Sequence, residues 1–230
     1  PSGVYKGALT VSGENFADVR LTMKINVQKR TLPDPAQWVF HLDLWQNPYA
    51  VARYYNVPLW SRQHFDIMKP LMQQLANAGQ KVITASVMHH PWAGQTEDPF
   101  DSMVFRMKKI DGSWVYDYTV FDRWVEFMMS LGIDRQINCY TLVPWALKFD
   151  YYDQATNRIR FVEAKPGEAA YEDYWFSFLK DFAGHLRQKG WFEKTTIAMD
   201  EREKSMMQKA FDLIFRADAG YKVSGAGDYY

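Results

Sequence analysis

Two adjacent carboxylates follow a short apolar segment in the C-terminal part of the sequence. Residues 195–199, Thr-Thr-Ile-Ala-Met, have the length and composition of a buried strand, and Asp200 and Glu201 come directly after it. Carboxylates at the carboxyl end of a barrel strand are the groups that glycosidases use for proton transfer and for stabilising positive charge on a sugar. The same residue types are also ordinary N-caps, and a helical pattern follows at 206–214. The pair is therefore either catalytic or a helix cap.

Polar side chains and aromatic rings also gather where the other predicted strands end. A sugar pocket needs this combination, because hydroxyl groups bind polar side chains and the C–H faces of the sugar ring stack on aromatic rings. The candidate sugar-binding residues are Asp43, Trp45 and Asn47 after the first strand, His89 and Trp92 after the second, and Tyr140 and Trp145 after the third. As alternatives, Trp45 and Trp145 are more often core residues than sugar platforms, and His89-His90 could be an exposed polar turn.

Histidine and cysteine usage indicates neither a metal centre nor a thiol nucleophile. The histidines at 41, 89 and 90 show none of the spacings typical of metal sites. The single cysteine, Cys139, excludes an internal disulfide, and its position in the apolar stretch 136–143 predicts a buried structural thiol. No Gly-x-Ser-x-Gly or phosphate-binding glycine loop occurs. We therefore predict no metal and no cofactor.

A repeated order of strand and helix must position these residues. Apolar strands are predicted at 38–44, 81–88, 135–143, 195–199 and from 221 onward, with helical stripes between them at 65–75, 121–128, 174–186 and 206–214. Pro70 is expected to kink or restart the first helix. This alternation predicts an α/β fold with parallel strands, which we interpret as a (β/α)8 TIM-type barrel truncated after about five strands. An open doubly wound sheet is the alternative.

Two insertions interrupt the alternation, each after a strand and before a helix. Residues 104–118, with a turn at Asp111-Gly112, and residues 146–163, with a turn near Asn157, both predict β-hairpins. In a (β/α) barrel the loops that follow strands carry the active site. The elaborate loops are therefore expected on the same end of the sheet as the carboxylates.

The N-terminal part has a different pattern. Apolar residues alternate strictly over 19–27 and pair with 4–11, so residues 1–29 predict a hairpin, interpreted as the C-terminal hairpin of a β-sandwich domain. Residues 30–37, with Pro33 and Pro35, are the predicted linker, and 38–230 the N-terminal part of a barrel catalytic domain. Because the sequence starts at Pro1, we expect a processed or excised piece.

Composition narrows the classes of function. The charges of the 27 basic and 27 acidic residues cancel, so the sequence has no net positive charge that would attract nucleic acid. No apolar run is long enough to span a membrane. Charged runs such as 201–204 are expected to be solvated. The aromatic content of 17% suits either a sugar pocket or an aromatic core.

The segments His41-Leu-Asp-Leu-Trp-Gln-Asn-Pro48 and Thr195-Thr-Ile-Ala-Met-Asp-Glu-Arg202 resemble glycoside hydrolase family 123. The resemblance implies β-N-acetylgalactosaminidases with a β-sandwich before a (β/α)8 barrel, and it covers the whole chain up to about the fifth strand. It further implies a glycan substrate and a secreted or periplasmic location. By the same resemblance, Asp200 orients and polarises the 2-acetamido group of the sugar, while Glu201 acts as general acid and then as general base.

The implied activity is retaining hydrolysis of terminal β-linked N-acetylhexosamine, with GalNAc favoured, by substrate assistance. The acetamido oxygen serves as nucleophile, so one carboxylate supports the positive intermediate and the other supplies the proton. Both side chains must share one pocket. A noncatalytic carbohydrate-binding module, an inactive barrel fragment, or a (β/α) enzyme with other carboxylate chemistry remain alternatives, and exposed barrel edges could support self-association.

Overall fold

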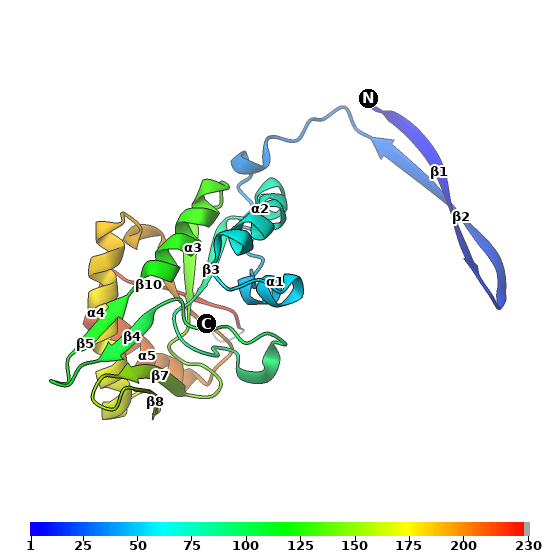
Figure 1. Cartoon of the computed structure of the whole chain (residues 1–230). Helices are drawn as coiled ribbons and strands as arrows, with labels where there is room; N and C mark the ends of the chain where they lie inside the picture. The colour runs from blue at the N-terminus through cyan, green and yellow to red at the C-terminus, as the bar shows by residue number, and fades with distance from the viewer. Residues whose placement is uncertain (228–230) are drawn as a thin grey trace. The chain divides into compact units, whose positions relative to one another are not determined.

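The computed structural model describes residues 1–227 and separates the chain into two compact units, divided between Gln37 and Trp38. In the first unit, β1 (Gly3–Gly13) and β2 (Phe16–Val27) form the antiparallel hairpin that the alternating pattern predicts (Figure 1). One register holds from Gly3 opposite Val27 to Val11 opposite Val19, and it shifts before Gly13, which lies opposite Phe16. All residues of both strands are exposed. The unit ends with a short 3-10 helix, η1 (Pro35–Gln37).

A parallel sheet forms the centre of the second unit. Its strands are β3 (Val82–Ser86), β6 (Gln136–Tyr140), β9 (Thr195–Met199) and β10 (Lys222–Gly225), in the order β10-β9-β6-β3. All three pairings are parallel, as the alternation of strand and helix predicts. The described residues form an open sheet, so the closed barrel is not observed among them.

The first predicted strand, 38–44, is largely absent. Only Leu42 pairs, in a single parallel bridge with Gln80 just before β3. The flanking residues Val39 and Phe40 are exposed, so no neighbour buries the apolar side chains that suggested a strand. The bridge nevertheless places this segment beside β3, next in the order of the sheet.

Within residues 1–227, five α-helices accompany the strands. They are α1 (Pro48–Tyr55), α2 (Arg62–Asn77), α3 (Thr119–Ser130), α4 (Ala169–Gln188) and α5 (Lys204–Ala217). Helix α2 continues through Pro70, so the expected restart does not occur. Helix α1 was not predicted. Short 3-10 turns, η2 (Ala93–Gln95) and η3 (Phe192–Lys194), lie in the connections.

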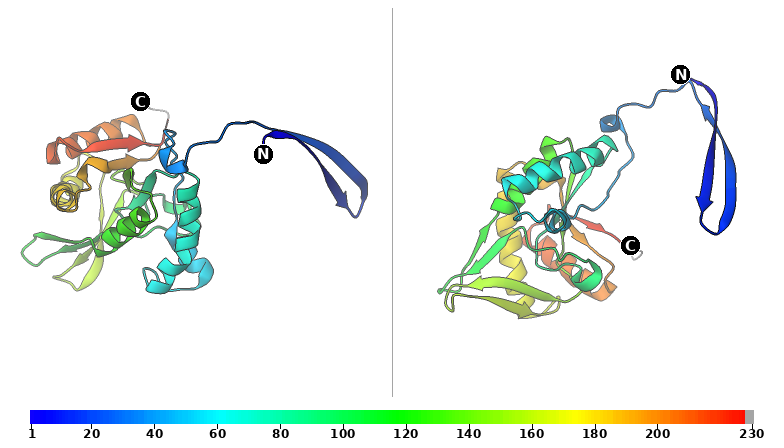
Figure 2. Two further views of the ribbon diagram at one scale, coloured as in Figure 1. Left: turned by 90° about the horizontal axis from the view of Figure 1, so that it is seen from above. Right: turned by 45° about the vertical axis from the view of Figure 1, so that its right-hand side comes forward.

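The two predicted insertions are hairpins, and together they make a second sheet. Strands β4 (Phe105–Lys108) and β5 (Trp114–Asp117) pair antiparallel, as do β7 (Lys148–Asp153) and β8 (Arg158–Glu163). A short parallel pairing of β4 with β7 joins them in the order β5-β4-β7-β8, and Figure 2 shows the hairpins side by side. Helix α4 packs against β5 and β8.

Strand register gives the parallel sheet one apolar and one polar face, because side chains alternate along each strand. Ile83 lies opposite Ile137 on the apolar face, while Thr84, Asn138 and Thr196 lie in one row on the polar face. The core contains many of the rings that raise the aromatic content, among them Phe121, Trp124, Phe149, Tyr171, Tyr174, Trp175, Phe178 and Phe182. No α-helix in the described part of the chain is long and apolar enough to cross a membrane.

Candidate active site

The carboxylate of Asp200 is fixed by two N–H donors immediately after β9. One oxygen, Oδ1, accepts the backbone N–H of Glu201 at 2.8 Å, and Oδ2 accepts the indole Nε1–H of Trp145 at 3.1 Å. Asp200 is half-buried and Glu201 is exposed. Hydrogen bonds to a carboxylate are stronger than those to neutral acceptors, so the orientation of Asp200 depends on Trp145.

Neither acid caps the following helix. The N-cap position of α5 is Glu203, which makes no side-chain hydrogen bond there. Strand β9 ends at Met199, so Asp200 and Glu201 lie in the short connection between strand and helix. The capping interpretation of the pair is therefore wrong.

Asp200 and Glu201 line one cavity of about 200 Å³, although neighbours in a regular strand point to opposite faces. The end of β9 at Met199 removes that constraint. Helix α5 contributes further lining residues, including Met207 and Phe211, and Gly227 closes another side. A Cβ atom on Gly227 would lie 3.0 Å from Cγ of Glu201, so the glycine leaves room for the acid. Both acidic residues therefore contribute to the wall of the same cavity.

Arg202 belongs to this site, in contrast to the expectation that residues 201–204 form a solvated face. Its guanidinium lies 4.7 Å from the centre of the Trp145 ring, a cation–π distance. Its Nε atom is buried and has no hydrogen-bond partner among the described residues. Arg202 therefore contacts the ring of Trp145 and also lines the cavity of the acid pair. In the sequence, the indication that Arg202 belongs to the site is that it directly follows Asp200 and Glu201. A run of charged residues does not show, however, which of its side chains turns inward.

Three predicted sugar-binding residues meet in an aromatic cluster. The ring of Trp45 lies 5.2 Å from that of Trp92 and 4.9 Å from that of Tyr140, and the last two are 5.1 Å apart. Trp92 and Tyr140 are buried, whereas Trp45 is 45% exposed. The backbone N–H of Trp145 donates to the carbonyl of Pro91 at 3.4 Å. The loops that follow β3 and β6 therefore touch on the same end of the sheet.

The remaining predicted residues have other local partners. Asn138 on β6 donates to Oδ2 of Asp43 at 3.0 Å, while Oδ1 of Asp43 is buried without a partner in the described chain. Burial raises the pKa of Asp43, against the opposing effects of His41 and the Asn138 hydrogen bond. The side chain of Asn47 caps α1 by accepting the N–H of Ala50 at 3.1 Å.

Comparison with known proteins identifies the family. A model described as "Glycoside hydrolase 123, catalytic domain" matches residues 45–230. The chain belongs to glycoside hydrolase family 123. A solved structure of a family 123 glycoside hydrolase from Clostridium perfringens matches with a TM-score of 0.85 and 30% sequence identity, over 100% of this chain and 42% of that one. No significant match is found among curated proteins.

The similarity extends beyond the matched catalytic domain, since the Clostridium perfringens structure aligns with all of this family 123 chain. The chain spans less than half of that structure's length. Within the described residues, no group of three or more histidine, cysteine, aspartate or glutamate side chains is arranged to hold a metal ion. Cys139 is buried in β6, as predicted, and burial raises the pKa of its thiol well above the ordinary range.

Proposed function

We propose that this family 123 chain supplies the catalytic carboxylates of a retaining glycosidase that removes terminal β-linked N-acetylhexosamine, with GalNAc favoured. The observation that carries the proposal is the shared cavity, which brings Asp200 and Glu201 together at the carboxyl end of β9. The glycan of a glycolipid is a reasonable natural substrate, because the similar Clostridium perfringens structure was solved to explain glycolipid glycan hydrolysis.

In the proposed first step, the acetamido oxygen of the substrate attacks the anomeric carbon as the bond to the leaving oxygen breaks. Glu201 gives its proton to that oxygen, and Asp200 accepts the acetamido N–H and stabilises the positive oxazolinium. Glu201 then takes a proton from water as water attacks the anomeric carbon. Two inversions leave the product with the configuration of the substrate. The hydrogen bond from Trp145 fixes the orientation of Asp200, which supports the proposed role of Asp200 in holding the acetamido group in place.

The architecture that we propose follows the same family. The order β10-β9-β6-β3, continued by the bridge at Leu42, supports this proposal, because the first five strands of a (β/α)8 barrel would lie side by side in chain order. Residues 1–29 are proposed as the end of a β-sandwich, 30–37 as a linker and 38–230 as the first part of the catalytic barrel. The exposed apolar stripe of the hairpin supports the sandwich interpretation, because a two-stranded ribbon is marginal in isolation.

Substrates that differ only at the sugar 2-position test the mechanism. The gene product that carries this sequence should release aryl groups from β-GalNAc and β-GlcNAc glycosides and fail with the matching galactosides and glucosides, whose 2-hydroxyl cannot form an oxazolinium. Asp200→Asn should lose about 10²- to 10³-fold in kcat, with no rescue by azide. Turnover of the 2-hydroxyl substrates, or formation of a glycosyl azide, would refute substrate assistance. Sugar binding without any turnover by the unaltered protein would favour the noncatalytic alternative.

A further inference from the structure

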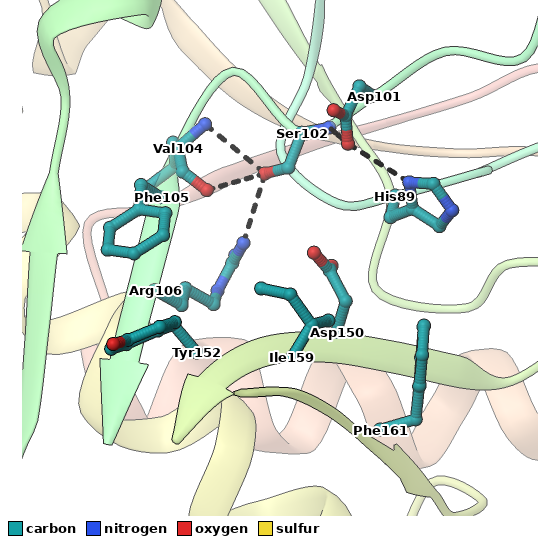
Figure 3. A pocket seen from close by; sticks show the side chains of 10 residues that line it. All are labelled: His89, Asp101, Ser102, Val104, Phe105, Arg106, Asp150, Tyr152, Ile159 and Phe161. Atoms are coloured by element: carbon teal, nitrogen blue, oxygen red, sulfur yellow. Dashed lines mark hydrogen bonds and ion pairs between the residues drawn. The ribbon is translucent and has the colours of Figure 1, made fainter. Parts of the chain in front are cut away.

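A second cavity, of about 330 Å³, lies between the hairpin sheet and the segments around His89 and Asp101 (Figure 3). None of its lining residues lines the cavity of the acid pair. Strand β4 provides Arg106, strand β7 provides Asp150, and β8 provides Phe161. The cavity is thus a product of the two insertions, whose pairing into one sheet creates it.

Arg106 is an unusual lining residue because it is only 3% exposed and incompletely bonded. Its Nη1 donates to Oγ of Ser102 at 3.3 Å, whereas Nε and Nη2 are buried without hydrogen-bond partners in the described residues. The guanidinium lies 4.1 Å from the ring centre of Phe178, which holds it by a cation–π contact. Buried charged groups are costly unless they are bonded, so unused donors indicate a polar group that is supplied from outside the chain.

Asp150 presents the opposite charge in the same cavity. Its Oδ1 is buried without a partner in the described residues, and no ion pair within 4.0 Å joins it to Arg106. In Figure 3 its carboxylate lies between Arg106 and His89, and Nδ1 of His89 is 3.0 Å from Oδ1 of Asp101. The backbone carbonyl of Asp150 accepts the hydroxyl of Tyr174 at 2.8 Å, which fixes this part of β7. The cavity therefore offers acceptors and donors on rigid elements.

Apolar side chains form the rest of the wall. Phe105, Ile159 and Phe161 are each about half exposed, at 50%, 53% and 46%. Large apolar side chains that stay exposed around a polar cavity are typical of a ligand site, since they lose their contact with water when the ligand arrives. A flat molecule with one apolar face and several hydroxyl groups fits this combination of rings, carboxylates and a guanidinium.

We propose that this cavity is a second carbohydrate site, which binds a neutral sugar unit of the glycan. The sugar hydroxyls donate to Asp150 and Asp101 and accept from Arg106, while a C–H face of the ring packs on Phe161 and Phe105. Two carboxylates in the wall disfavour an acidic sugar, because like charges would be brought together. That the ligand is part of the substrate glycan rests on the proposed function. That the ligand is a neutral sugar is inferred from the residues that line the cavity.

Contacts between loops connect this site to the acid pair. Pro91, two residues beyond His89, accepts the backbone N–H of Trp145, and the indole of Trp145 bonds to Asp200. The two cavities therefore lie on linked loops at the carboxyl ends of β3, β6 and β9.

Binding of lactose as a neutral probe, with 3′-sialyllactose as the acidic counterpart, tests the proposal. NMR titrations of the gene product that carries this sequence should show millimolar binding of lactose and at least about tenfold weaker binding of 3′-sialyllactose. Asp150→Asn and Phe161→Ala should each weaken lactose binding about tenfold. The matched controls Asp66→Asn and Phe215→Ala change an exposed residue of the same type that lines neither cavity, and they should leave lactose affinity unchanged. Melting curves establish that each variant is folded.

The outcomes separate this proposal from the proposed function. Equal lactose affinity in all folded variants, or tighter binding of 3′-sialyllactose than of lactose, would overturn the second site, whatever the hydrolysis assays give. Loss of lactose binding in Asp150→Asn and Phe161→Ala without any release from aryl β-GalNAc would keep the site and remove the catalytic proposal. Asp150 and Phe161 contact the sugar in different ways, so the second site is supported only if both variants lose lactose binding.

Discussion

The indole N–H of Trp145 holds the carboxylate that is proposed to orient the acetamido group of the substrate. This hydrogen bond, at 3.1 Å, comes from the loop after β6, whereas Asp200 follows β9. Trp145 is also packed against Arg202, so its ring position does not depend on the hydrogen bond alone. Because the N–H and the ring of Trp145 have different partners, substitutions at this position can test the two contacts separately.

Replacing Trp145 with Phe should lower kcat about tenfold to a hundredfold, because a hydrogen bond to a charged group contributes about 1.5–3 kcal/mol. Aryl glycosides with good and poor leaving groups should lose activity alike, since protonation of the leaving oxygen is unaffected. Steady-state kinetics on both kinds of substrate provide the measurement. Trp145→His, which retains an N–H donor, should recover part of kcat. A loss confined to KM would mean that Trp145 only contacts the sugar.

Glu201→Gln should affect aryl glycosides with good and with poor leaving groups unequally. Gln cannot donate the proton that a poor leaving group needs, whereas an activated aryl leaving group departs without it. General acid catalysis contributes about 10²- to 10⁴-fold, so the loss should be of that order for poor leaving groups and much smaller for activated ones. Comparison of kcat/KM for a series of aryl β-GalNAc substrates tests this, and an equal loss across the series would contradict the acid role.

At the scale of elements, His64 joins the start of α1 to the start of α2. Its Nδ1 accepts the backbone N–H of Trp60 at 3.1 Å, and its Nε2 lies 2.9 Å from the carbonyl of Pro48. These partners fit the neutral imidazole with the proton on Nε2. Burial lowers the pKa of His64 below its ordinary value of 6.5, with the carbonyl contact opposing.

The lowered pKa of His64 predicts a loss of stability in mild acid. The folded chain favours the neutral ring, so its contribution is fully present above about pH 6.5 and is lost as the pH falls through the lower folded-state pKa. Urea unfolding between pH 8 and pH 5 should show a declining free energy of unfolding. His64→Asn keeps a short acceptor near Trp60 and should lower stability at pH 8 but reduce the decline. An unchanged slope in that variant would assign the decline to other groups.

Local periodicity predicted the strands of the parallel sheet well, and β9 matches the expected residues 195–199. It could not predict that β4 pairs with β7, because Met107 and Tyr152 are far apart in sequence and neither hairpin pattern specifies a partner for its outer edge. Helix α1 was missed although Asn47-Pro48 is a suitable start signal, with Asn as N-cap and Pro at the first helical position.

The sequence predicted the candidate site only where its carboxylates are adjacent in the chain. Asp200 and Glu201 were found because the strand and the pair are consecutive. The hydrogen bond from Trp145 depends on how two loops meet, and the inward position of Arg202 depends on that ring, so residue types alone do not reveal either contact. The roles of Asp43, Trp45, Asn47, His89, Trp92 and Tyr140 in binding sugar stay predictions.

For the whole molecule, the irregular segment between β2 and η1, near the end of the first compact unit, is the natural point of cleavage. Residues 28–34 are exposed and have no helix or strand, and Lys29 and Arg30 provide trypsin sites there. Exposed irregular segments are cut far faster than paired strands and packed helices. Limited trypsin digestion should therefore cut first after Lys29 or Arg30, as mass spectrometry of the fragments would show.

The double variant Lys29→Gln with Arg30→Gln is the control for this digestion and should remove the early cut. The large fragment should retain a cooperative thermal transition, because the aromatic core belongs entirely to the second unit. First cuts inside the helices, or a fragment without a transition, would contradict the division into independent units. Sedimentation of the fragment would also test the predicted self-association through sheet edges.

The contact between Trp145 and Asp200 gives the protein a built-in spectroscopic reporter. An indole whose N–H faces a carboxylate and whose ring faces a guanidinium has an electronic environment unlike that of a core tryptophan. Among the nine tryptophans, the ¹⁹F signal of a fluorinated Trp145 is identified by its disappearance in Trp145→Phe. When a sugar amide engages Asp200, that signal should shift, so occupancy of the acid pair becomes visible without turnover, labelled substrate or a crystal.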